Sequence, residues 1–236
     1  MKAFFKASFL MMLIFSLSGC MYPQDELAQN KIPYKEQIQS VQSAVDQFKA
    51  ANGGILPIKT RDQKTPIFEK YPIDFQRITP KYMAEPPGNA FESGGIFQYV
   101  LVDVEKNPTV KIFDLRMADK IRDMKIRMQA LDYPPFKSEL ADNVYSIDYK
   151  RIGYKEEPYA VSPYSQKNLS FVLNGAGDVF VDYRSDLYEA LKKHKKTEFK
   201  PGDDIRSILV EDSDFVPAYS MPYTVDQNNE PVFMTK

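Results

Sequence analysis

The sequence lacks most of the residue types from which recognisable catalytic and metal sites are built. Its 236 residues include one cysteine, one histidine, no tryptophan and only 10 glycines. One cysteine cannot form an internal disulfide, and the single His194 lies among lysines that would repel a metal cation. No phosphate-binding glycine loop, EF-hand spacing, G-x-S-x-G motif or metalloprotease signature occurs. These absences predict a protein that is not an enzyme and holds no metal or other cofactor.

Long apolar runs are also scarce. The longest extends from Ala7 to Leu17, whereas a helix needs roughly twenty residues to span a bilayer. Two lysines precede this run, and the small residues Ser18 and Gly19 follow it. This order is the layout of a secretory signal peptide, which is removed rather than folded. The sequence therefore predicts an exported protein.

The end of the signal peptide carries a more specific pattern. The four residues LSGC, which end at Cys20, resemble the lipobox of bacterial lipoproteins at every position. In that family the cysteine receives a diacylglycerol group, the chain is cut before it, and the cysteine becomes the mature N-terminus. The resemblance implies a signal peptide over 1–19, lipidation at Cys20 and a lipid-anchored tether over 20–33, with membrane lipid as a partner. The alternatives are a nonlipidated signal peptide with a chance cysteine and a small transmembrane anchor.

Charge of one sign does not predominate. The chain has 31 basic and 32 acidic residues, which argues against nucleic acid as a partner. Its 17 prolines exclude a simple helical bundle, because proline interrupts helices. After the predicted signal peptide, about 217 residues remain, enough for one large or two small cores without a disulfide.

Hydrophobic periodicity predicts an α+β fold. Apolar residues recur at helical spacing over 34–52 and again over 117–131. Between them, 94–116 consists of two β-rich runs joined at Asn107-Pro108. Further helices are expected near 185–196 and 205–210.

Segments of the sequence recur in the same order. "IDFQRI" at 73–78 returns as "IDYKRI" at 147–152, and 85–101 aligns without gaps to 157–173. Each copy then ends in Asp-x-Arg before a helix. The pattern predicts a tandem duplication of a helix followed by an antiparallel β-hairpin. The alternative is a coincidence between two common hairpin and helix motifs.

The predicted duplication defines the domain organisation. A first α+β module covers 34–116, and a second covers 117–236 with a C-terminal tail, both packed as one globular unit. The first helix, its "NGGILP" exit, the "PPGNAF" loop and the following hairpin also resemble the head of a type IV pilin or pseudopilin. This resemblance implies a similar topology only, because folds of this size host many functions.

The repeated Asp-x-Arg sequences pair Asp114 with Arg116 and Asp182 with Arg184. Residues two apart lie on the same side of a strand, so each pair can form where the strand passes into the helix. One interpretation is a structural junction. The other is a pair of equivalent ligand-binding spots, one in each copy.

A basic run surrounds His194 near the end of a predicted helix. Its lysines are Lys192, Lys193, Lys195 and Lys196. Cations favour the C-terminal end of a helix dipole, and the alternative is contact with anionic lipid headgroups or an anionic wall polymer. Farther on, Asp203 or Asp204 is expected to cap the next helix rather than to form a glycosidase-type acid pair.

The lipobox, the short tether, the cysteine-free domain and the balanced charge together resemble lipoproteins of Gram-positive, bacillus-like bacteria. The resemblance implies a protein on the outer face of the cytoplasmic membrane. Its expected role is noncatalytic, as an interaction or scaffold protein of the cell envelope, with an envelope protein or an anionic wall polymer as partner. A solute-binding lipoprotein of a transporter and a carboxylate-dependent wall hydrolase remain alternatives. A carboxylate-lined cleft between the halves favours these alternatives.

Overall fold

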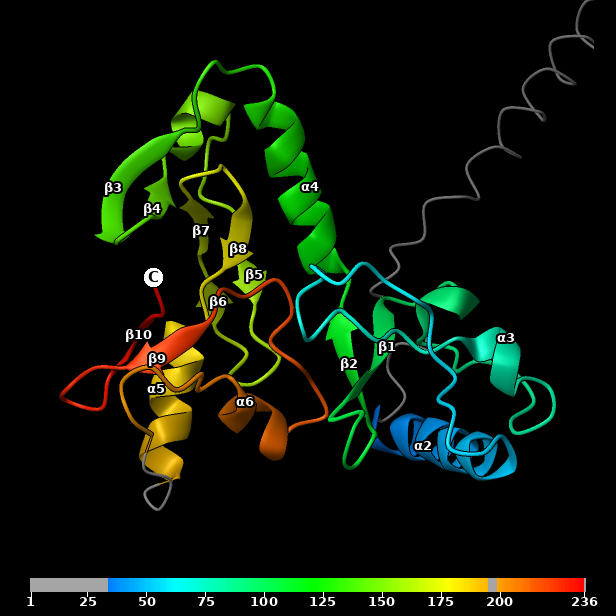
Figure 1. Cartoon of the computed structure of the whole chain (residues 1–236). Helices are drawn as coiled ribbons and strands as arrows, with labels where there is room; N and C mark the ends of the chain where they lie inside the picture. The colour runs from blue at the N-terminus through cyan, green and yellow to red at the C-terminus, as the bar shows by residue number, and fades with distance from the viewer. Residues whose placement is uncertain (1–33, 195–198, 236) are drawn as a thin grey trace, which may run out of the picture.

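The computed structural model describes residues 34–194 and 199–235. Within these ranges the chain combines helices with small antiparallel sheets, in agreement with the predicted α+β class (Figure 1). No helix in the described ranges is both long enough and apolar enough to cross a membrane. The predicted signal peptide, Cys20, the tether, Lys195 and Lys196 lie outside the described residues.

The first half places one long helix against a β-hairpin. Its elements are α2 (Tyr34–Ala51), α3 (Phe75–Ile78), the 3-10 helix η4 (Phe91–Ser93), β1 (Phe97–Val102) and β2 (Thr109–Asp114). The next helix, α4 (Arg116–Met128), packs its buried residues into the core of the second half. Val41 and Val45 lie one helical turn apart on α2 and are fully buried. The Gln42 amide oxygen accepts a hydrogen bond from Val110 N–H at 2.7 Å, and its amide nitrogen donates to Pro108 C=O at 3.0 Å. These bonds fix the helix to the start of β2.

The second half is built around a four-stranded antiparallel sheet with the strand order β3-β4-β7-β8. Its elements are β3 (Phe136–Ala141), β4 (Val144–Ile147), the 3-10 helix η5 (Tyr149–Ile152), β5 (Ala160–Val161), β6 (Asn168–Leu169), β7 (Phe171–Asn174), β8 (Val179–Val181), α5 (Arg184–Lys193), α6 (Ser207–Glu211), β9 (Tyr223–Val225) and β10 (Pro231–Phe233). α4 leads from β2 into this half and contacts β8 (Figure 1).

The backbone contacts of the two halves correspond. Asp74 N–H donates to Pro57 C=O at 2.8 Å in the first half. Asp148 N–H donates to Pro135 C=O at 2.7 Å in the second. The antiparallel backbone pairs also correspond. Ile58 pairs with Ile73 in the first half, as Phe136 pairs with Ile147 in the second. Pro72 pairs with Val100 in the first half, as Ser146 pairs with Val172 in the second. The two repeated segments therefore share one local topology.

The two halves differ in two places. β5 and β6 pair in the second half, whereas the first half has the turn of η4 in the corresponding region. Ile112 and Val181 occupy equivalent positions in the two hairpins. Asp182 follows Val181 directly. Phe113 separates Ile112 from Asp114, so the first hairpin reaches its Asp-x-Arg sequence one residue later.

A C-terminal stretch, which we call the joining segment (residues 212–220), connects the halves. It runs parallel to β2 and to β8 where it meets each of them. Ile112 N–H donates to Asp214 C=O at 3.0 Å, and Val181 N–H donates to Tyr219 C=O at 2.8 Å. A small apolar cluster at this junction contains Val100, Phe113, Val216 and Ala218.

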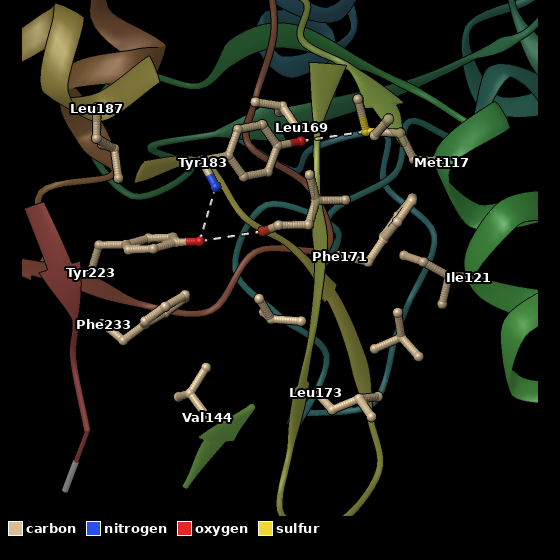
Figure 2. Packing of buried hydrophobic residues seen from close by; sticks show 14 of the residues in the cluster. Met117, Ile121, Val144, Leu169, Phe171, Leu173, Tyr183, Leu187, Tyr223 and Phe233 are labelled. Carbon is tan, nitrogen blue, oxygen red and sulfur yellow. Dashed lines mark hydrogen bonds between the residues drawn. The ribbon is translucent and has the colours of Figure 1, made fainter. Parts of the chain in front are cut away.

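The final hairpin, β9–β10, belongs to the core of the second half (Figure 2). The rings of Tyr223 and Phe233 have centroids 5.1 Å apart. The Tyr223 hydroxyl accepts from Tyr183 N–H at 3.0 Å and donates to Val181 C=O at 3.3 Å, while the Tyr183 hydroxyl contacts the Met117 sulfur at 3.4 Å. Residues 223–225 and 231–233 thus form an antiparallel hairpin that closes one side of this core.

Candidate functional site

A groove of about 760 Å³, which we call the junction groove, opens between the first half and α6. Its lining comes from the loop before β1, the turn between β1 and β2, and α6. Its apolar and aromatic lining residues are Ile67, Phe68, Tyr71, Val102, Val104 and Val210. The volume lies within the range of small-molecule sites, roughly 300–1,000 Å³.

The apolar wall of the junction groove is accessible to a ligand. Ile67 is 59% exposed although its side chain is large and aliphatic. Single exposed aliphatic residues are ordinary, but one that lies in a concave apolar surface indicates a binding site.

Lys111 is the cation most withdrawn from water in this groove. Its Nζ donates to Val210 C=O at 2.9 Å and to Ser213 C=O at 2.5 Å. Burial lowers the pKa of Lys111, and the negative charges of Asp214 and Asp212 oppose that shift. The side chain therefore fixes α6 and the joining segment to β2 while it forms part of the groove wall.

Three carboxylates, Asp103, Glu105 and Glu211, also line the junction groove, and all three are exposed. A glycosidase-type acid works from an environment that disfavours its charged form, which a solvated carboxylate does not have. Among the residues that the structure describes, no group of three acidic, histidine or cysteine residues could hold a metal ion.

Both predicted Asp-x-Arg pairs form, and the structure adds a third. In each pair the Arg Nη2 lies 2.5–2.6 Å from the Asp Oδ2, and the Asp Oδ1 accepts the Arg backbone N–H at 2.8–3.1 Å. The pairs are Asp114 with Arg116 before α4, Asp182 with Arg184 before α5, and Asp204 with Arg206 before α6. The same Asp-x-Arg ion pair thus lies at the start of three helices.

The surroundings of these pairs favour a structural role. The guanidinium of Arg184 lies 4.5 Å from the ring centroid of Phe233, and that of Arg206 lies 5.1 Å from that of Phe68. Shallow cavities of about 360 and 480 Å³ lie beside Arg116 and Arg184. The alternative of two equivalent ligand-binding spots therefore stays a prediction.

The basic run begins at the end of α5. Lys192 and Lys193 are exposed, and His194 is the C-cap residue. The Lys192 Nζ lies 4.1 Å from the Tyr188 ring centroid, and the His194 Nε2 lies 3.0 Å from Asp212 Oδ2. These positions agree with cations at a helix C-terminus.

The predicted N-cap at Asp203 or Asp204 is wrong in position. α6 begins at Ser207, its N-cap residue is Arg206, and no side chain caps it. Asp204 lies two residues before this N-cap position, and its carboxylate accepts Arg206 N–H. The Asp203 carboxylate accepts Lys200 N–H. The spacing of Asp204 and Arg206 was the available signal, because it repeats the two earlier pairs.

Sequence reasoning also missed Lys111. It alternates with buried neighbours in β2, which predicts a solvated side chain. The joining segment, far away in sequence, covers it instead. No local pattern carries that information.

Fold and groove together define a two-part α+β protein in which a C-terminal segment joins similar halves. Residues 34–114 match the model of the YphF family N-terminal domain. The match extends from the start of α2 to the end of β2, about a third of the chain. No curated protein and no solved structure matches the chain. The β1–β2 turn of the junction groove lies inside the matched region, and α6 lies outside it.

Proposed function

We propose that this protein is a lipid-anchored, extracytoplasmic protein with a noncatalytic binding or scaffold role in the cell envelope. The observation that carries the proposal is the junction groove, whose walls are apolar and whose carboxylates are exposed. The likeness of LSGC to a lipobox supports an anchor at Cys20 on the outer face of the cytoplasmic membrane.

The partners that this role implies are of two kinds. Membrane lipid holds the protein through Cys20. An envelope protein or an anionic wall polymer contacts its surface, the polymer through the basic run at the end of α5 (Lys192, Lys193, Lys195 and Lys196).

The two halves derive from a tandem duplication in this proposal. The matching bonds from Asp74 and Asp148 to proline carbonyls support it, as do the corresponding strand partners. The third Asp-x-Arg pair and the β9–β10 hairpin support a partial third copy at the C-terminus. Such an origin explains why the final segment pairs with both halves.

The second candidate is a solute-binding lipoprotein of a transporter, which the volume of the junction groove favours. A wall hydrolase has less support, because Asp103, Glu105 and Glu211 are exposed. The purified protein should therefore show no turnover of peptidoglycan. Hydrolysis that disappears in a Glu105→Gln or Glu211→Gln variant would replace the binding role with an enzyme.

The anchor is tested by Cys20→Ala in cells grown with a labelled fatty acid. The wild type should take up label and sediment with membranes, while the variant should lose both properties. Cys20→Ala protein that stays equally membrane-bound, beside an unlabelled wild type, would refute lipidation. Arg116→Ala, far from the signal peptide in sequence, serves as the control and should keep the label.

A further inference from the structure

The junction groove has the features of a site for one particular class of ligand, an inference that rests on the binding role proposed above. Its wall is apolar over Ile67, Phe68 and Val104, and its volume of about 760 Å³ suits a single elongated molecule. A wall of this kind removes the apolar body of a ligand from water.

Lys111 adds one polar anchor to this apolar wall. An ammonium group has three N–H donors, and in the described structure two of them serve the carbonyls of Val210 and Ser213. Asp212 and Asp214 act on the charge at longer range, and neither forms an ion pair with Lys111 within the described chain. The third N–H donor has no acceptor among the described residues, and Lys111 lines the groove.

The charges at the rim of the groove have less effect on a ligand than the charge of Lys111. Lys70 and Lys106 oppose Asp103, Glu105 and Glu211, and most of these groups are exposed to water. Water and salt screen such charges strongly, whereas a buried charge is screened much less. Lys111 therefore decides which head group is favoured.

We infer that the junction groove binds a single-chain anionic amphiphile, with its apolar chain along Ile67, Phe68 and Val104 and its carboxylate or phosphate head on Lys111. Such a molecule meets both features of the groove at once. A neutral apolar molecule would leave the donor of Lys111 without a partner, and burying an unpaired donor is unfavourable.

The test titrates the full chain, held in phosphatidylcholine nanodiscs, with the fluorescent fatty acid dansylaminoundecanoate and with its methyl ester. The ester has the same apolar body without the charge, so it should bind about tenfold more weakly. Ile67→Ser should weaken binding of the acid, and the matched control Ile55→Ser should not. Ile55 is also 59% exposed but does not line the groove. Lys111→Met should remove the difference between acid and ester.

A second arm distinguishes the source of the amphiphile. Donor vesicles that contain fluorescent lysophosphatidylglycerol report whether the groove extracts a single-chain membrane lipid instead of a free fatty acid. Binding in either arm with the expected effect of Ile67→Ser supports the inference. No binding in both arms, equal binding of acid and ester, or equal loss in the Ile67→Ser and Ile55→Ser variants overturns it. These outcomes do not affect the labelling and hydrolysis tests of the proposed function. The ligand inference and the proposed function can therefore fail separately.

Discussion

Asp186 is a carboxylic acid that has almost no contact with water. The residue is 3% exposed, and the Ser165 hydroxyl donates to its Oδ1 at 2.6 Å. Its Oδ2 has no hydrogen-bond partner among the described residues. Burial raises the pKa of Asp186, and the hydrogen bonds from Ser165 and Ser162 only partly oppose that shift. Folding therefore disfavours the charged form of Asp186 relative to the unfolded chain.

We expect Asp186→Asn to stabilise the protein at neutral pH. Because the folded-state pKa is raised, the contribution of Asp186 to stability is complete below its unfolded pKa and is lost as the pH rises through the folded value. Above the folded-state pKa the folded protein has to hold a buried charge, and asparagine removes it. Denaturant titrations should give the variant a free energy of unfolding higher by about 1 kcal/mol at neutral pH, with a smaller difference in acid.

The exposed Asp142 provides the control, since Asp142→Asn should change stability at neither pH. An Asp186→Asn variant that is less stable than the wild type at neutral pH would contradict the assignment. It would mean that the carboxylate is stabilised in its charged form.

Single residues also mark what the sequence can predict. Asp182 and Arg184 were recognisable because their spacing alone brings them together. Asp186 was not, because its burial depends on Ser165, which approaches from the loop between β5 and β6. Contacts between distant segments leave no local spacing to detect.

Among the elements, three helices begin with an Asp-x-Arg pair, and the burial of the arginine side chain differs among the three pairs. The side chain of Arg206 is 10% exposed, that of Arg184 is 36% exposed and that of Arg116 is 45% exposed. Removal of the aspartate leaves the guanidinium without its carboxylate. The loss of stability should therefore follow the burial of the arginine that remains.

We expect Asp204→Ala to lower the free energy of unfolding most, by about 2 to 3 kcal/mol, because it leaves a buried arginine unpaired. Asp182→Ala should have an intermediate effect, and Asp114→Ala should cost about 1 kcal/mol. Chemical denaturation of the three variants measures the order. The matching Asp→Asn variants, which keep an acceptor for the Arg backbone N–H, separate the loss of charge from the loss of that bond. Equal losses at the three sites would refute the dependence on burial.

Helices were the elements that periodicity predicted best. The expected helices over 34–52 and 117–131 correspond to α2 and α4, with ends that differ by at most three residues. The β5–β6 pair had no such signal, because two-residue strands contain no alternation to detect. Their position depends on the loop that covers Asp186.

For the whole molecule, the contact between the halves depends on a few polar bonds. The Glu69 Oε1 accepts Tyr219 N–H at 2.8 Å, and Tyr219 has a positive φ of 57°. Burial raises the pKa of Glu69 against the opposing effects of the Tyr219 hydrogen bond and of Arg61 and Arg206. One side chain of the first half thus holds the joining segment in an uncommon backbone conformation.

Glu69→Ala should loosen the junction without unfolding either half. It leaves the Tyr219 N–H without its acceptor, which is worth about 1 to 3 kcal/mol if the group stays buried. Hydrogen exchange should accelerate at Val216 N–H and Ile112 N–H, which bond across the junction, and stay unchanged at Val45 in α2. Glu69→Gln keeps the acceptor and should behave like the wild type. Uniform acceleration throughout the chain would show that the halves do not open separately.

The recurrence of short segments was visible in the sequence at this scale, and the way the two halves join was not. The recurrence of "IDFQRI" as "IDYKRI" marks equivalent segments. The joining segment could not be placed by that comparison. It forms one backbone bridge with Ile112 in the first half and one with Val181 in the second, and both are long-range contacts. The junction groove follows from this long-range pairing, so no local pattern predicted it.

The joining segment also makes its own synthesis a condition for covering the edges of β2 and β8. A ribosome makes both strands before residues 212–220, so each strand has an open edge until that segment follows. Open strand edges recruit other chains and expose the backbone to proteases. A chain truncated near residue 204 also lacks α6 and the β9–β10 hairpin, which contribute to the core of the second half, so we expect such a product to aggregate and to be degraded.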